Sequence, residues 1–160
     1  MKITEASLTK YFHELVEHPR IQQYAQDHQT ARSKFVTKNN GNIILPILSI
    51  VNTAGVRYAG VAHTCISIDI SRWILEDETE AKAVVRHEVA HLLHHYSKTG
   101  GRAHGKEFHA TLKVVSPKTW RKDRHWYPNP VIEKARTKAH PTSPELTIVK
   151  VGNRPYTSRA

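Results

Sequence analysis

Apolar residues of the first 18 positions recur every three to four residues, the spacing of a helix with one buried side. They are Leu8, Tyr11, Phe12, Leu15 and Val16. We therefore predict a helix over residues 4–18. Pro19 ends this helix, because proline cannot donate the next backbone hydrogen bond, and it can open a second short helix that reaches about residue 30.

Three runs rich in β-branched residues follow, and turn signals separate them. They cover residues 43–51, 56–62 and 65–70. In the last run isoleucines alternate with polar residues from Ile66 to Ile70, which is the period of a half-buried strand. The sequence therefore predicts three short strands, joined by tight turns.

The strongest helix prediction covers residues 78–97. Asp77 can cap its N-terminus, and Glu80 stands where it would complete a capping box. Buried contacts would come from Val84, Val85, Leu92 and Leu93. Gly100-Gly101 ends the helix. A further helix is predicted over about 105–115, and because prolines recur beyond it, we expect an extended arm from about residue 130.

Length and composition limit the number of domains and the compartment in which the protein can work. The length of 160 residues fits one domain with a single core. Cys65 is the only cysteine, which excludes an intramolecular disulfide and fits a reducing compartment. The N-terminal residues lack a signal-peptide pattern, and no apolar run reaches membrane-spanning length. We expect a cytoplasmic protein with no membrane partner.

The net charge of +10 favours a polyanionic partner such as nucleic acid. The alternative is a basic soluble protein without such a partner. Between Lys98 and Arg124 there are eight Lys or Arg residues against two acidic ones. Basic side chains can follow phosphates and aromatic rings can stack on unpaired bases, so this stretch could hold single-stranded DNA. The candidate residues are Arg102, Lys106, Lys118, Trp120, Arg121, Lys122, Arg124 and Trp126. The alternative is a charged surface whose aromatic residues fold into the core.

The candidate chemistry lies in the segment His87-Glu88-Val89-Ala90-His91. Residues four apart on a helix are only about 40° apart around its axis, so both histidines can bind one zinc ion. Glu88 can reach a metal-bound water without ligating the metal, and can accept its proton during attack on a carbonyl carbon. The pattern indicates a zinc-dependent hydrolase, while the alternative is a pair of surface histidines on an amphipathic helix.

A catalytic zinc site needs a third protein ligand and one open position. Downstream candidates are His94, His95, His104, Glu107 and His109. His94 and His95 continue the same straight helix, so they cannot converge with the first pair. A chain reversal at Gly100-Gly101 would return the others, and the residues themselves leave His104, Glu107 and His109 open.

The motif, followed by His104-Gly105-Lys106-Glu107-Phe108, resembles the SprT-like metalloproteases of the Spartan type over about residues 56–125. The resemblance implies an α+β fold with a zincin-like core, in which a small antiparallel sheet packs on the active-site helix. It also implies Zn²⁺ as cofactor, His104 as third ligand beside His87 and His91, Glu88 as base, and Phe108 as a packing residue. The cysteine zinc ribbon of many members is missing. We divide the chain into a protease domain, residues 1–128, and a basic, proline-containing extension, residues 129–160.

These observations favour a metalloprotease that hydrolyses peptide bonds with a Glu-activated, zinc-bound water, acting on nucleic-acid-associated proteins. Two alternatives remain. One is a DNA-binding module with a structural or catalytically silent zinc site. The other is a metallohydrolase of small amides or peptides, for which the basic C-terminal half would have no evident use.

Overall fold

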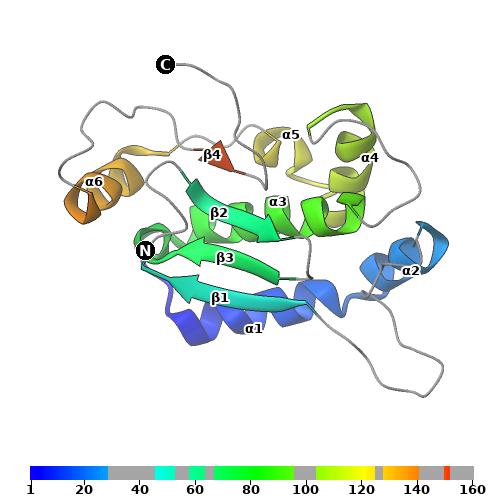
Figure 1. Ribbon diagram of the computed structural model, residues 1–160, viewed down its shortest axis with the longest axis horizontal. Coiled ribbons are helices and arrows are strands. Elements are labelled where there is room, and N and C mark those ends of the chain that lie inside the picture. Colours follow the sequence, from blue (N-terminus) through cyan, green and yellow to red (C-terminus); the bar gives the residue numbers. More distant parts are fainter. Residues whose placement is uncertain are drawn as a thin grey trace.

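The computed structural model describes residues 1–28, 46–52, 58–63, 67–95, 104–124, 128–140 and 150–151. Within these residues the fold is α+β, with six α-helices, a short 3₁₀ helix and a small sheet. Figure 1 shows the helices α1 (Glu5–Val16) and α3 (Glu78–His95) behind the sheet, where they pack on each other and on its strands. The hydrophobic core lies between these two helices and the sheet.

The sheet is mixed. Its strands are β1 (Ile47–Val51), β2 (Tyr58–His63), β3 (Ser67–Ser71) and the two-residue β4 (Lys150–Val151), in the order β1-β3-β2-β4. β2 runs antiparallel to β3, whereas β1 runs parallel to β3 and β4 parallel to β2.

The expectation of an antiparallel sheet is therefore correct only for the β2–β3 pair. β3 lies between β1 and β2, so the first two strands of the chain are not neighbours. Strands that follow each other along the chain usually pair as hairpins. β1 and β2 do not pair in this way, because β3 lies between them.

The N-terminal predictions are confirmed. Thr4 caps α1 by accepting a hydrogen bond from the Ser7 amide, and α1 buries Leu8, Phe12 and Val16. α1 ends at Val16, shortly before Pro19, and α2 (Pro19–His28) begins at that proline. The Tyr24 hydroxyl lies 2.8 Å from the Thr111 hydroxyl, which ties α2 to α4 (Lys106–Val115).

The helix predicted over 78–97 is present as α3 in the described residues. A 3₁₀ helix, η1 (Arg72–Glu76), precedes it, and Asp77 accepts a hydrogen bond from the Glu80 amide at 3.2 Å. The Asp77 amide donates to the Ile74 carbonyl at 3.3 Å, and the Glu80 carboxylate pairs with Lys122 at 3.4 Å. Val84, Val85, Leu92 and Leu93 are buried as predicted.

The C-terminal part holds two helices that the sequence analysis did not predict, α5 (Trp120–Asp123) and α6 (Pro130–Ala139). The expectation of an extended arm from residue 130 is wrong for α6. Asn129 caps α6 through a bond from the Ile132 amide, and a proline at the first helical position is favourable rather than disruptive. Ile132 is fully buried where α6 packs against η1. The division at residues 128 and 129 stays a prediction.

Among the described residues, no helix combines the length and the apolar character that a membrane crossing would require.

Candidate metal centre

Three histidine side chains meet at one point. His87 and His91 come from adjacent turns of α3, and His104 lies in the turn that leads into α4. Their Nε2 atoms lie 3.0 Å (His87–His91), 3.1 Å (His87–His104) and 2.9 Å (His91–His104) apart. Among the described residues, this is the group of histidine, cysteine and acidic side chains close enough to share a metal ion.

The donor set fits zinc. With zinc–nitrogen distances of about 2.05 Å, the ligand nitrogens of a tetrahedral site lie about 3.3 Å apart, close to the separations found here. A proton on one ring nitrogen can serve only one neighbour, so hydrogen bonding does not satisfy three nitrogens in mutual contact. A cation can accept all three lone pairs. Because the described residues supply three ligands and so leave a fourth position for water or substrate, the set matches a catalytic site better than a closed structural one.

Phe108 of α4 holds the three imidazoles in place. Its ring is fully buried, stacks on His91 at 4.4 Å between centroids, and meets His104 edge-on at 5.2 Å. It also contacts His87, again at 5.2 Å. The expected packing role of Phe108 is therefore present, and it is directed at the histidines themselves.

A hydrogen bond at Nδ1, the ring nitrogen that does not face the other histidines, orients His87. Its Nδ1 atom lies 2.7 Å from the backbone carbonyl oxygen of Asp123. The Asp123 carboxylate forms a two-point ion pair with Arg86, the residue before His87. Burial opposes the charge of the Arg86 guanidinium, but the hydrogen bonds and charge interactions with Asp123 and Tyr11 together outweigh burial and raise the pKa of Arg86 above its usual range. Arg86 therefore stays cationic at every pH at which the protein is folded.

Glu88 lies on the face of α3 that packs against β2. Its side chain is fully buried. A Cβ atom placed on Gly60 of β2 would come 3.1 Å from Glu88 Cγ, so the absence of a side chain at Gly60 makes room for this glutamate. The sequence predicts Glu88 as a catalytic residue from its place after His87, but nothing in the pattern points to Gly60.

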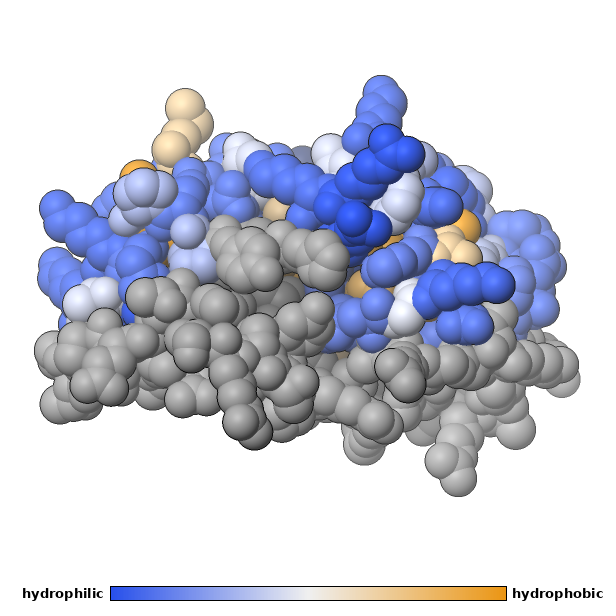
Figure 2. All heavy atoms as spheres, turned by 90° about the horizontal axis from the view of Figure 1, so that it is seen from above, coloured by the Kyte–Doolittle hydropathy of each residue, from blue (hydrophilic) through white to orange (hydrophobic). Residues whose placement is uncertain are grey.

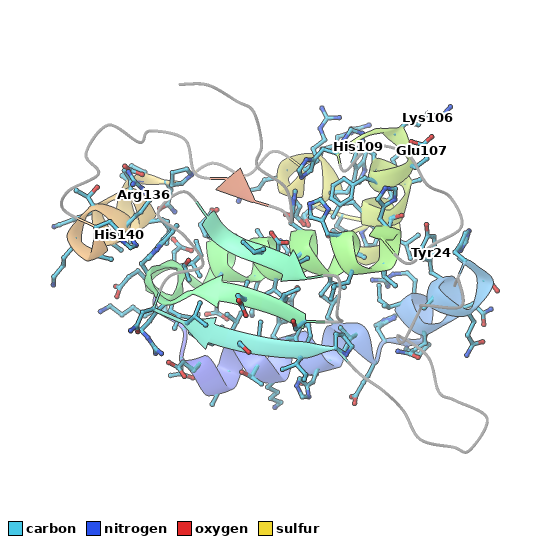
Figure 3. All side chains as sticks on the ribbon, in the orientation of Figure 1. Tyr24, Lys106, Glu107, His109, Arg136 and His140 are labelled. Atoms are coloured by element: carbon cyan, nitrogen blue, oxygen red, sulfur yellow. The ribbon has the colours of Figure 1, made fainter. Side chains whose placement is uncertain are left out.

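The other candidates for a third ligand lie elsewhere. Glu107 stands in the first turn of α4, and Figure 3 shows it with Lys106 at the outer end of that helix. His109 lies on the side of α4 that faces α5, with its ring 6.1 Å from the ring of Trp120. His94 is buried and its ring meets Phe108 edge-on at 6.0 Å. The side chain of His95 lies outside the described residues.

The candidate nucleic-acid residues are spread over α4, α5 and the segment between them. Lys106, Lys118, Arg121 and Lys122 are exposed, and Arg124 is half-buried. Arg102 and Trp126 lie outside the described residues. Figure 2 views the molecule from the side of α4 and α5, and hydrophilic side chains cover most of the described surface there.

Trp120 is half-buried against the core. Cations of its own chain surround its ring, namely Lys113 at 4.5 Å, Arg121 at 5.3 Å and Arg124 at 5.6 Å. This arrangement resembles the alternative of an aromatic residue folded into the core more than an open platform for stacking bases. The surrounding cations still make a positive patch.

Sequence spacing does not reveal that Asp123 orients His87. Asp123 is 36 residues away from His87 along the chain and belongs to a single helical turn without an amphipathic pattern. The available sequence signal is that Asp123 is an isolated acidic residue within a strongly basic stretch. A buried ion pair would explain an acidic residue at such a position.

Comparison with protein families gives one match. The model of the SprT-like family matches residues 12–125, which include the three histidines, Glu88 and Asp123. The comparisons with curated proteins and with solved structures give no match.

Proposed function

This chain is a member of the SprT-like family, and on that premise we propose that it is a zinc-dependent metallopeptidase. His87, His91 and His104 would hold the zinc ion, and Glu88 would act as the general base. The convergence of three Nε2 atoms within 3.1 Å, beside a buried glutamate, carries this proposal.

Zinc, when bound, supplies Lewis acidity, which lowers the pKa of water toward neutrality and polarises a peptide carbonyl. The chain supplies proton transfer. The Glu88 carboxylate accepts the proton of the attacking water and passes it to the amine that leaves. Glu88 is well placed for both transfers, because it follows His87 directly and is excluded from bulk solvent.

The test compares metal content and proteolysis in the purified protein. Wild type should bind one zinc ion per chain and cleave an unfolded protein substrate. Glu88→Gln should retain zinc and lose about 10²- to 10⁴-fold in rate, the usual contribution of general acid–base catalysis. Glu107→Gln is the matched control, since Glu107 lies outside the histidine cluster, and its rate should be unchanged. Absence of zinc from wild type, or full activity of Glu88→Gln, overturns the proposal.

The competing reading is a DNA-binding module with a structural or silent zinc site. A structural site needs no carboxylate beside its first ligand, so the buried Glu88 counts against it. X-ray absorption of the zinc-loaded protein separates the two readings: three nitrogens and one water oxygen indicate a catalytic site, and a fourth protein ligand indicates a structural one. Activity confined to short peptide amides would instead favour the small-substrate hydrolase.

We further propose that the substrates are proteins associated with DNA, and that the exposed cations of α4, α5 and the intervening segment contact phosphates. Lys106 of α4, Lys118 of the intervening segment and Arg121 of α5 are exposed, and α4 and α5 both border the histidine site. Lys113, Arg121 and Arg124 surround the ring of Trp120, so Trp120 serves as a packing residue between these cations. Phosphate contact therefore has more support than base stacking.

Charge reversal tests this proposal. The pair Lys118→Glu and Arg121→Glu should weaken binding of single-stranded DNA and reduce its salt dependence. The pair Lys10→Glu and Lys138→Glu changes the net charge equally at exposed positions of α1 and α6, and should have a much smaller effect. If both pairs weaken binding equally, only general charge matters. If DNA leaves the cleavage rate unchanged, recruitment is wrong while the peptidase assignment stands.

A further inference from the structure

Arg86 and Asp123 form a buried ion pair directly behind the histidine cluster. Arg86 Nε donates to Asp123 Oδ2 at 2.7 Å and Arg86 Nη2 donates to Oδ1 at 3.1 Å. The Asp123 side chain is fully buried, and that of Arg86 is 16% exposed. A fork of two parallel bonds fixes direction as well as distance, so Arg86 sets the orientation of the Asp123 carboxylate.

Two further hydrogen bonds hold this pair. The Thr119 hydroxyl donates to Asp123 Oδ2 at 2.9 Å, and Arg86 Nη1 donates to the Tyr11 hydroxyl at 3.1 Å. Tyr11 belongs to α1, Arg86 to α3, and Asp123 to α5. The pair therefore connects the short helix α5 to the two long helices of the core.

α5 needs this connection. It has four residues, and Thr119 makes no side-chain capping bond to it. A single helical turn has little stability of its own, because nucleation fixes several residues for few hydrogen bonds. The position of the Asp123 backbone is therefore decided by tertiary contacts, among which the two-point bond to Arg86 is the most directional.

The Asp123 backbone carbonyl accepts a hydrogen bond from His87 Nδ1 at 2.7 Å. A carbonyl oxygen can only accept, so the proton of neutral His87 resides on Nδ1. Nε2 of His87 then carries a lone pair directed at the point where His91 and His104 meet. The location of one carbonyl thus selects both the tautomer and the ring orientation of His87.

Stability alone gives a weak account of the ion pair. Removing two charges from water costs about as much as their attraction returns, so a buried pair adds little net stability compared with an apolar pair of equal volume. Such a pair does impose geometry. The geometry that it imposes here ends at a histidine of the proposed metal site.

We propose that Arg86 and Asp123 are positioning residues for His87: their ion pair places the Asp123 carbonyl so that His87 presents Nε2 to the metal. This inference rests on the proposed function only in taking His87 as a zinc ligand. It adds that metal affinity depends on Arg86, which is not one of the proposed ligands.

The principal test is Arg86→Lys, which keeps the charge but loses the fork. Its matched control is Arg20→Lys, because Arg20 also bridges two helices, donating from α2 to the backbone carbonyls of Val114 and Val115 in α4. Zinc affinity is measured by competition with a chromophoric chelator. Arg86→Lys should weaken zinc binding about 10- to 100-fold, the usual effect of losing a group that supports a ligand. Arg20→Lys should leave it unchanged.

A second readout needs no metal. In the metal-free protein with ¹⁵N-labelled histidine, at a pH where imidazoles are neutral, His87 of wild type should appear as a single tautomer protonated on Nδ1. Arg86→Lys should give a mixture of both tautomers. A loss of thermal stability shared by the two lysine variants, with an equal fall in zinc affinity, would indicate a general structural effect and overturn the proposal.

If Arg86→Lys does not fold, the double change of Arg86→Leu and Asp123→Asn removes both charges together and avoids an unpaired buried charge. It should show the same loss of affinity and the same tautomer mixture. Unchanged zinc affinity and an unchanged His87 tautomer in either variant overturn the positioning role and leave the peptidase proposal intact. Failure of wild type to bind zinc overturns the peptidase proposal instead.

Discussion

Gly60 of β2 lies directly against Glu88 of α3, and the contact leaves no room for a side chain at position 60. A Cβ atom there would be 3.1 Å from Glu88 Cγ, 2.9 Å from Val84 Cγ1 and 3.0 Å from Ile70 Cδ1. The glycine therefore allows the central helix to approach the sheet closely at the level of the proposed base. β2 and α3 are therefore in contact at Glu88, the residue that we propose as the base.

Gly60→Ala should lower activity and stability together. Forcing an extra methyl into a packed interior costs about 1–3 kcal/mol, and relief requires α3 or the Glu88 side chain to shift. We expect a fall of at least about tenfold in the rate of cleavage, since small displacements of catalytic groups are costly. Zinc content should remain at one ion per chain, because the three atoms nearest to a Cβ at position 60 belong to Val84, Ile70 and Glu88 and not to the histidines. Steady-state kinetics and urea unfolding measure the two effects.

The double variant with Val84→Ala separates these effects. Val84 makes the closest of the three contacts, so shortening it should restore part of the lost stability. The contact with Glu88 remains, and activity should therefore stay low. Recovery of full activity along with stability would show that Gly60 matters only for packing.

His104→Ala should abolish tight zinc binding, whereas His109→Ala should not. His104 Nε2 lies within 3.1 Å of both other ligand nitrogens, while the ring of His109 lies beside Trp120. Removal of a ligand should weaken zinc affinity by more than about 100-fold, the upper end of the effect of losing a supporting residue. Chelator competition on both variants and on wild type provides the measurement. Equal affinity of His104→Ala and wild type would remove His104 from the ligand set.

Phe108→Leu should weaken zinc binding without unfolding the protein. Leucine keeps most of the buried apolar volume, so the cost in stability is modest, but it loses the ring stacking on His91 at 4.4 Å. Phe12→Leu is the matched control, because Phe12 is equally buried in α1 and its ring contacts His13, which lies outside the histidine cluster. Both variants should lose similar free energy of unfolding, and only Phe108→Leu should lose zinc affinity. Parallel losses of affinity would refute a specific role for the ring.

The parts of this fold that local pattern controls were predictable from the sequence. Apolar spacing predicts α1, Pro19 predicts the start of α2, and apolar residues with Asp77 as cap predict α3, while β-branched runs predict the strands. The pair His87 and His91 with Glu88 follows from helical geometry alone. His104 required the resemblance to a family, because spacing left Glu107 and His109 equally open.

The parts that depend on tertiary contacts were not predictable. The order β1-β3-β2 is decided by which strand fills the centre of the sheet, and turn signals do not encode that choice. α5 is too short to carry a periodic signal, and its residue Asp123 acts through a backbone carbonyl that any residue type possesses. The recurrent prolines of this region predict breaks in regular structure and so hide α6, although Pro130 after Asn129 is a favourable helix start.

Asp77 should stabilise the fold in a pH-dependent manner. Burial by itself would raise the pKa of Asp77, but hydrogen bonds from the Glu80 amide, the Asn129 side chain and the Thr79 amide, with the charge of the N-terminus, together outweigh it and lower the pKa below its usual value. A group with a lowered pKa in the folded state stabilises that state at pH values above its unfolded pKa, about 3.9 for aspartate. The contribution is lost as pH falls through the folded pKa. Asp77 links the start of α3 to the start of α6, so both helices share the loss.

The measurement is the free energy of unfolding of Asp77→Asn against wild type between pH 7 and pH 2.5, with a chelator present so that metal loss does not contribute. Asparagine can still cap α3 but carries no charge, and its amide would face the amide of Asn129. Wild type should be more stable by about 1 kcal/mol at pH 7, the usual scale of one hydrogen bond such as that lost to Asn129, and the difference should shrink below about pH 4. Glu14→Gln, at an exposed carboxylate of α1 paired loosely with Lys10 at 3.9 Å, should show no comparable trend. A difference between wild type and Asp77→Asn that stays constant down to pH 2.5 would mean that the Asp77 charge has no part in holding α3 and α6 together.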